Sequence, residues 1–186
     1  MRRCLHKAAA AAALLIWVAA PSAQRSPPGN LSSDAALMKT ARAIHERIIA
    51  LDTHNDIETS NFSWSLNYTQ DLNTQVNLPK MKRGGLDASF FIVYVAQGEL
   101  TPAGFDAAYT TAVEKFEAIH RLTKVLAPDQ IELALTAGDV RRINAAGKKV
   151  ALIGTENGYA IGTDLGRVKE FFDRGGRYLS LAHNGH

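Results

Sequence analysis

Val150-Ala151-Leu152-Ile153-Gly154-Thr155-Glu156 is the stretch that decides the fold, because it is apolar until its last two residues. A run of this kind, without alternating polar positions, is typical of a parallel strand that is buried on both faces. The run Ala88–Val95 has the same character, and shorter apolar runs occupy 48–51 and 178–182. Segments with helical periodicity separate most of these runs. This alternation predicts an α/β fold in which parallel strands are joined by helical crossovers.

The helical segments are recognised by apolar residues that recur every three or four positions. Ala108, Ala112 and Phe116 have this spacing, which places them on one face of a helix over 105–126. A helical turn is expected at 78–83, before Gly84-Gly85, after a long polar loop that begins at residue 58. Further helices are predicted at 35–48, 136–146 and 165–173, and a short strand at 131–135.

Metal-capable side chains follow three of the predicted strands. His54 and Asp56 end the first strand, and because residues two apart point to the same side of a strand, they can converge on one ion. Glu156 ends the run quoted above, and His183 follows the last strand. Imidazole nitrogens and carboxylate oxygens are zinc ligands, and barrel enzymes place their chemistry at the carboxyl ends of parallel strands. These four residues together predict a metal site.

Each of these residues also has a structural interpretation. Asp56 can cap a turn, and a His-x-Asp pair arises by chance. Glu156 can lie in a surface turn, and His183 can be a hydrogen-bonded core histidine. The occurrence of all four at equivalent strand ends favours the metal site.

The first 23 residues predict a secretory signal peptide. Arg2, Arg3 and Lys7 precede an apolar run, Ala8–Ala20, that small residues follow. This run of 13 residues is shorter than the roughly 20 that a membrane span requires. We therefore expect no stable membrane span, a linker over 24–34, a barrel domain over 35–186, and export to the periplasm or the medium.

Composition narrows the range of partners. The chain has 21 basic and 18 acidic residues, and the three basic residues of the leader account for the whole excess. The remainder is balanced in charge, so no nucleic-acid partner is expected. The single cysteine, Cys4, lies in the leader, which leaves the exported chain without a disulfide.

The segments around the four metal-capable residues resemble the membrane (renal-type) dipeptidases, a family of metallopeptidases. Leu51–Asp56 is similar to the family's opening signature, in which an Asp-x-His-Asn-Asp sequence supplies the first metal ligands. Leu78–Gly85 is similar to its Leu-Pro-x-Met-x-x-Gly-Gly segment, and 151–158 is similar to its Gly-x-Glu-Gly-Gly element. Arg177–Asn184 resembles its Arg-Tyr-Leu-Thr-Leu-Thr-His-Asn element.

The resemblance implies the N-terminal half of a (β/α)8 TIM-like barrel of the metal-dependent hydrolase type. It implies two zinc ions, with His54 and Asp56 on the first ion and Glu156 bridging both. It gives His183 a catalytic role, in contact with the substrate and the developing oxyanion. The implied reaction is hydrolysis of a dipeptide by a metal-bridging hydroxide. The resemblance also implies that the intact enzyme can form a homodimer.

The chain departs from the family pattern in two residues and in length. Asn157 replaces a glycine beside the bridging glutamate, and Ala182 replaces a threonine before the histidine. A full barrel has about 250 residues or more, and the family's second half supplies two further histidine ligands that have no counterpart here. We therefore expect a zinc-dependent dipeptidase that is inactive as this fragment. Two alternatives stay open: an inactive exported remnant or binding module, and another amidohydrolase-like metal hydrolase that acts on lactams or acylamino acids.

Overall fold

The structure is a computed structural model that describes residues 31–184. The predicted signal peptide and most of the predicted linker lie outside the described residues. The chain divides into two units, Met1–Met38 and Lys39–His186. None of the helices described is both long enough and apolar enough to cross a membrane.

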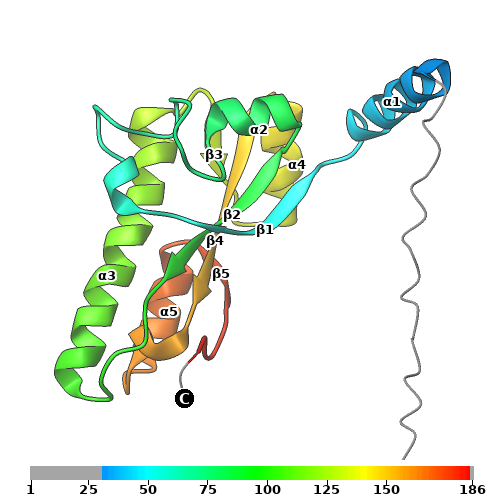
Figure 1. Cartoon of the computed structure of the whole chain (residues 1–186). Coiled ribbons are helices and arrows are strands. Elements are labelled where there is room, and N and C mark those ends of the chain that lie inside the picture. The colour runs from blue at the N-terminus through cyan, green and yellow to red at the C-terminus, as the bar shows by residue number, and fades with distance from the viewer. Residues whose placement is uncertain (1–30, 185–186) are drawn as a thin grey trace, which may run out of the picture. The chain divides into compact units, whose positions relative to one another are not determined.

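Five strands form one parallel sheet (Figure 1). They are β1 (Leu51–Asp56), β2 (Ala88–Tyr94), β3 (Ile131–Leu133), β4 (Lys149–Glu156) and β5 (Gly176–Leu179). β1 pairs with β2, β2 with β4, and β4 with both β3 and β5. The α/β class and the parallel strands predicted from the apolar runs are therefore confirmed.

The helices follow the predicted segments with shifted ends. They are α1 (Leu31–His45), α2 (Leu78–Gly84), α3 (Pro102–Arg121), α4 (Ala137–Ala145) and α5 (Gly166–Asp173). Short helical segments occur at Thr59–Asn61, Leu122–Leu126 and Gly158–Ile161. Helix α1 begins at Leu31, inside the predicted linker, and α3 begins at Pro102 because Thr101 caps it.

The central strands β2 and β4 are buried on both faces, as their composition predicts, whereas β1 is largely exposed. Phe91, Val93 and Ile153 point to the face covered by α3 and α5, where they join the larger apolar cluster with Phe116 and Phe171. The opposite face carries Val150 and Leu152 and packs at its beginning against Ile143 of α4. Because side chains alternate along a strand, this second face is also the one that carries Glu156 at its far end. Apolar packing thus fills both faces and leaves the polar residues at the strand ends.

Tyr178 links strands across the face that carries Glu156. Its ring lies against Gly154 of β4, packs on Phe90 of β2 with ring centroids 5.1 Å apart, and its hydroxyl donates to the Thr53 carbonyl of β1 at 3.2 Å. A Cβ atom on residue 154 would lie 2.2 Å from Cζ of Tyr178. Gly154 therefore provides the space in which one tyrosine ties β5 to the strand that carries His54.

Replacing Gly154 with alanine is expected to lower the free energy of unfolding by about 1–3 kcal/mol, the usual cost of overpacking a buried site. The added methyl group must displace the Tyr178 ring from Phe90 and Thr53. Urea unfolding at low protein concentration measures the change. Gly84→Ala is the matched control, because a Cβ on residue 84 meets nothing within 4 Å; equal effects of the two variants would contradict this role for Gly154.

Candidate metal centre

Three side chains from two strands converge at the carboxyl ends of the sheet. His54 Nε2 lies 3.6 Å from Asp56 Oδ1 and 3.2 Å from Glu156 Oε2. One donor atom from each of the three residues lies within 4.8 Å of the other two. The structure thus brings together the three residues that the sequence proposed as metal ligands.

The spacing of these donors matches what a metal ion requires. Ligands about 2.1 Å from a tetrahedral zinc ion lie about 3.4 Å from one another, and the His54 distances of 3.6 and 3.2 Å lie on either side of that value. The group offers one neutral nitrogen donor and two anionic oxygen donors, a donor set that zinc accepts. The residues present therefore fit a divalent metal ion.

Glu156 lies between two histidines and uses a different oxygen toward each. Its Oε2 faces His54, while its Oε1 lies 3.4 Å from His183 Nε2. Its side chain is also the least exposed of the group, at 18%. A carboxylate with this arrangement has both oxygens directed into the site, as a bridging position between two ions would need.

His183 reaches the site from a loop, so its predicted position directly after a strand is wrong. β5 ends at Leu179, and the following Leu181 is exposed. Backbone hydrogen bonds still guide the loop: Ser180 N–H donates to the Thr155 carbonyl at 3.0 Å, and Gly158 N–H donates to the Leu181 carbonyl at 3.2 Å. The His183 ring then packs edge-on against Tyr94, with centroids 5.0 Å apart.

Asn157 holds the backbone beside Glu156 in a conformation that favours glycine. Its φ is 74°, in the left-handed region, where asparagine is tolerated better than most residues. The buried amide donates to the Val95 carbonyl at 3.0 Å, its oxygen accepts from Tyr159 N–H, and its own N–H donates to Ser180 Oγ. The asparagine side chain thus adds hydrogen bonds to Val95, just after β2, and to Tyr159, whereas the bond to Ser180 comes from the backbone.

Replacing Asn157 with alanine is expected to destabilise the chain by about 2–3 kcal/mol, since buried groups lose partners and the positive φ becomes strained. Asn157→Gly loses the same side-chain hydrogen bonds but keeps an unstrained backbone. The alanine variant should therefore be less stable than the glycine variant by about 1 kcal/mol or more, which urea unfolding can resolve. Equal stability of the two variants would show that the backbone conformation contributes nothing.

Burial and carboxylates together act on two tyrosines near the site. Burial, reinforced by Glu58 and Asp56, raises the pKa of Tyr68 to about 12. Burial, reinforced by Glu156 and Asp56, also raises the pKa of Tyr178. Both phenols therefore stay protonated at neutral pH. The carboxylates at this end of the sheet contribute to the raised pKa of each tyrosine.

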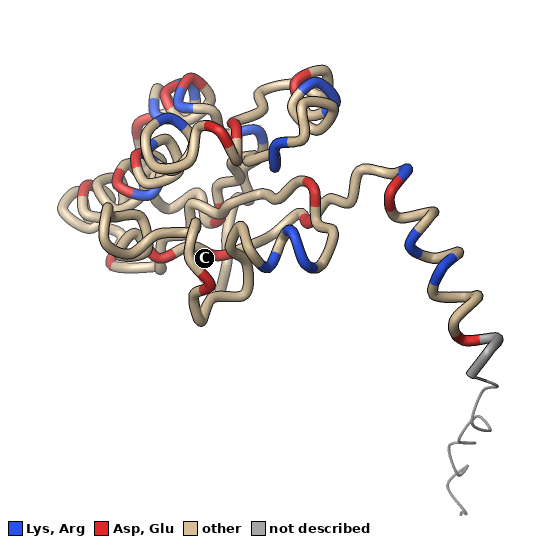
Figure 2. The backbone as a smooth tube through the Cα atoms, turned by 90° about the horizontal axis from the view of Figure 1, so that it is seen from above, with Lys and Arg blue, Asp and Glu red and all other residues tan. Residues whose placement is uncertain are grey.

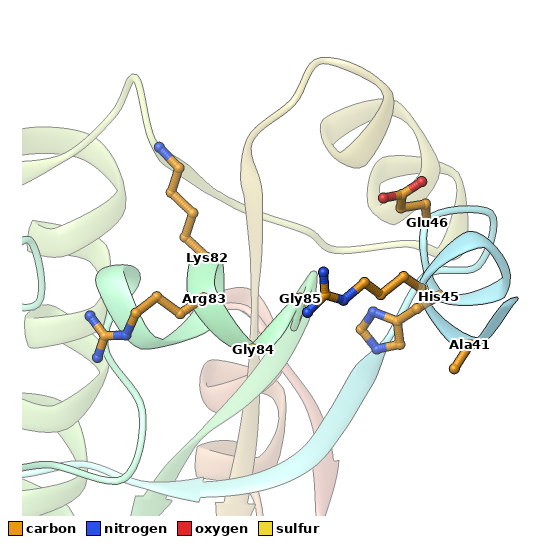
Figure 3. Close-up of a pocket in the computed structure, with 8 residues that line it drawn as sticks. Ala41, His45, Glu46, Lys82, Arg83, Gly84 and Gly85 are labelled. Carbon is orange, nitrogen blue, oxygen red and sulfur yellow. The ribbon is translucent and has the colours of Figure 1, made fainter. Parts of the chain in front are cut away.

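A pocket elsewhere in the chain has different chemistry. It lies beside Gly85 and is lined by the basic side chains Arg42, His45, Lys82 and Arg83 together with Glu46 (Figure 3). Arg83 points away toward Asp71, to which it donates two hydrogen bonds at 3.0 and 3.1 Å. His54, Asp56, Glu156 and His183 do not line it. Blue and red segments are also interspersed along the helices in Figure 2 and form no continuous basic stripe over residues 39–184.

Comparison with known proteins gives one family and one fold. A family model described as "Membrane dipeptidase (Peptidase family M19)" matches residues 38–186. Dipeptidase 3 of Mus musculus is 28% identical over 155 residues, which are 80% of this chain and 30% of the mouse protein. Dipeptidase tcpJ of Claviceps purpurea is 29% identical over 62% of this chain and 28% of its own length.

Solved structures agree in fold. The probable dipeptidase PvdM of Pseudomonas aeruginosa superposes with a TM-score of 0.74 at 22% identity, over 81% of this chain and 38% of PvdM. A metallopeptidase of Rhodobacter sphaeroides, solved with a phosphinate mimic of the dipeptide L-Ala-D-Ala, gives a TM-score of 0.58 at 23% identity over 73% of this chain and 45% of that one. The chain therefore spans less than half the length of the relatives that it matches.

Proposed function

Because the chain belongs to the membrane dipeptidase family of metallopeptidases, we propose that it is the metal-binding N-terminal part of a zinc-dependent dipeptidase. The observation that carries the proposal is the convergence of His54, Asp56 and Glu156 within 4.8 Å of one another. Membership of the family supports peptide hydrolysis as the reaction. One imidazole and two carboxylates are ligands that zinc accepts, which supports zinc as the metal.

In this proposal, each of the four site residues has a separate role. His54 and Asp56 would hold one ion together with Glu156, whose second oxygen faces His183 and would be available to another ion. When bound, the metal supplies a nucleophile from water at neutral pH and polarises the scissile carbonyl. His183 donates a hydrogen bond from Nε2 toward the oxygen that gains charge, and its ring is held in place by Tyr94.

Dipeptides are the proposed substrates. Support comes from the dipeptidases among the relatives and from the phosphinate mimic of L-Ala-D-Ala bound by the Rhodobacter sphaeroides structure. L-Ala-D-Ala is therefore the first substrate to test. We also propose that the chain is exported and begins near Ala23 or Gln24 after cleavage, which N-terminal sequencing of the exported material would test.

The zinc content of the purified chain tests the metal proposal. Equilibrium dialysis should give at least one tightly bound ion, and His54→Ala should remove it. His45→Ala is the control, because His45 is an exposed histidine of α1 and lies outside the group. Equal zinc binding by the His54→Ala variant would refute the proposed ligand set.

A further inference from the structure

A buried lysine lies beside the candidate metal centre and has no part in the proposed chemistry. Lys115 projects from α3 and is only 8% exposed. Its Nζ lies 5.7 Å from the centroid of the Tyr94 ring. Tyr94 ends β2 and is paired in register with Glu156, and the same ring packs against His183. Lys115 therefore places a positive charge next to Tyr94, which in turn contacts His183 of the site.

This ammonium group has no close counter-ion. Among the described residues, none of the ion pairs within 4.0 Å involves Lys115, although Glu156 pairs with both histidines. The only fully buried side-chain polar atom without a partner in the described part of the chain is His120 Nδ1. The Lys115 ammonium consequently keeps contact with solvent while its stem is buried, as lysines at the edge of an apolar core do.

The charges that face Lys115 all belong to the strand ends. Burial lowers the pKa of Lys115, while Glu58, Asp56 and Glu156 oppose that shift. Asp56 ends β1, Glu58 follows it two residues later, and Glu156 ends β4. Two of these three carboxylates are members of the candidate metal group. Charge at Lys115 and charge in the metal site are thus coupled.

We propose that Lys115 is a positioning residue that sets the affinity of the site for divalent cations. Its ammonium offsets the repulsion among Asp56, Glu58 and Glu156 when no metal is bound, and it opposes the entry of a second positive charge. This inference rests on the proposed metal-binding function and adds a residue that supplies no ligand atom. Coulomb interactions near a partly buried site are stronger than in bulk water, so a charge at Lys115 can change metal affinity measurably.

Titration of the full chain with Zn²⁺ or Co²⁺ tests the inference. Lys115→Gln and Lys115→Met remove the charge, and we expect each to bind the metal about tenfold more tightly, which corresponds to about 1.4 kcal/mol. Lys115→Arg keeps the charge and should stay within about twofold of the unmodified chain. Lys82→Gln makes the same change in net charge on an exposed side chain of α2 and should leave the affinity unchanged.

Two further readings separate an electrostatic role from a structural one. The gain in affinity should shrink as salt is added, because screening weakens charge interactions, whereas a packing effect would not depend on salt. Far-UV circular dichroism identifies a variant that fails to fold, and the methionine variant keeps an apolar stem of similar length in the core.

The outcomes distinguish the two proposals. Metal binding by the unmodified chain with no gain in either neutral variant would overturn the role of Lys115 and leave the metal site intact. Absence of metal binding in the unmodified chain and in both neutral variants would overturn both proposals. Binding that appears only in the neutral variants would support the role of Lys115 and contradict the proposed function of the unmodified chain.

Discussion

Replacing Glu156 with glutamine is expected to weaken zinc binding by more than about 100-fold, because loss of groups that merely support a ligand already costs 10- to 100-fold. Glutamine keeps the shape of the side chain but removes the negative charge that faces both histidines. An amide is a poor zinc ligand beside a carboxylate, since zinc sites use carboxylate oxygen, imidazole and thiolate. Competition with a chromophoric chelator measures the affinity.

The matched control for this prediction is Glu114→Gln. Glu114 is exposed on α3, next to Lys115 in the sequence, and the substitution makes the same change in net charge. It should leave zinc affinity within about twofold if the effect depends on a ligand atom and not on overall charge. Wild-type affinity in the Glu156→Gln variant would place the metal elsewhere in the chain.

The loss should be found in the metal-bound state alone. Glu156 lies near the carboxylate of Asp56, which repels it. Without metal, its close partners of opposite charge type are His54 and His183. Metal-free Glu156→Gln is therefore expected to unfold at the same urea concentration as the metal-free unmodified chain, or at a slightly higher one. Added zinc should raise the midpoint of the unmodified chain and not that of the variant, since a ligand that binds only the folded state stabilises it.

The strands and the position of the site follow from apolar runs and their ends. The run Ala88–Val95 is apolar apart from Ser89 and the hydroxyl of Tyr94, so its composition favours burial on both faces. His54 and Asp56 then share a face because the side-chain period of a strand is two residues. These local rules were sufficient to place three of the four proposed site residues in one group.

Features that depend on contacts distant in sequence could not be predicted in this way. β5 ends at Leu179 and not at Ala182, and the loop that follows is held by a hydrogen bond from Gly158 N–H to the Leu181 carbonyl, a contact that no local pattern encodes. Lys115 occupies a regular position in an amphipathic helix, and only the packing of α3 on the strand ends reveals its charge beside the site. The positive φ of Asn157 likewise occurs together with hydrogen bonds to Val95 and Ser180, which lie just after β2 and β5.

The purified 186-residue chain is expected not to hydrolyse L-Ala-D-Ala, even with zinc in excess. The described residues supply His54, Asp56 and Glu156 to one ion, whereas a second ion would find only Glu156 among the proposed ligands. A single carboxylate leaves most of a tetrahedral shell to water. Because hydrolysis depends on both ions, it should be abolished and not merely slowed. In a ninhydrin or coupled amino-acid assay, the signal should equal that of a reaction without protein.

The same chain is expected to self-associate through its open sheet. Among the described strands, β1 pairs only with β2, and β3 and β5 each pair only with β4, so unpaired parallel edges remain, whereas a closed barrel has none. Unpaired edges recruit other strands, and apolar side chains such as Leu51 and Leu181 are exposed near them. Sedimentation velocity over a range of concentrations measures the association. If the chain binds zinc at low protein concentration but does not hydrolyse the substrate, inactivity is due to the missing ligands and not to aggregation. A cooperatively folding monomer that hydrolyses dipeptides would overturn both expectations.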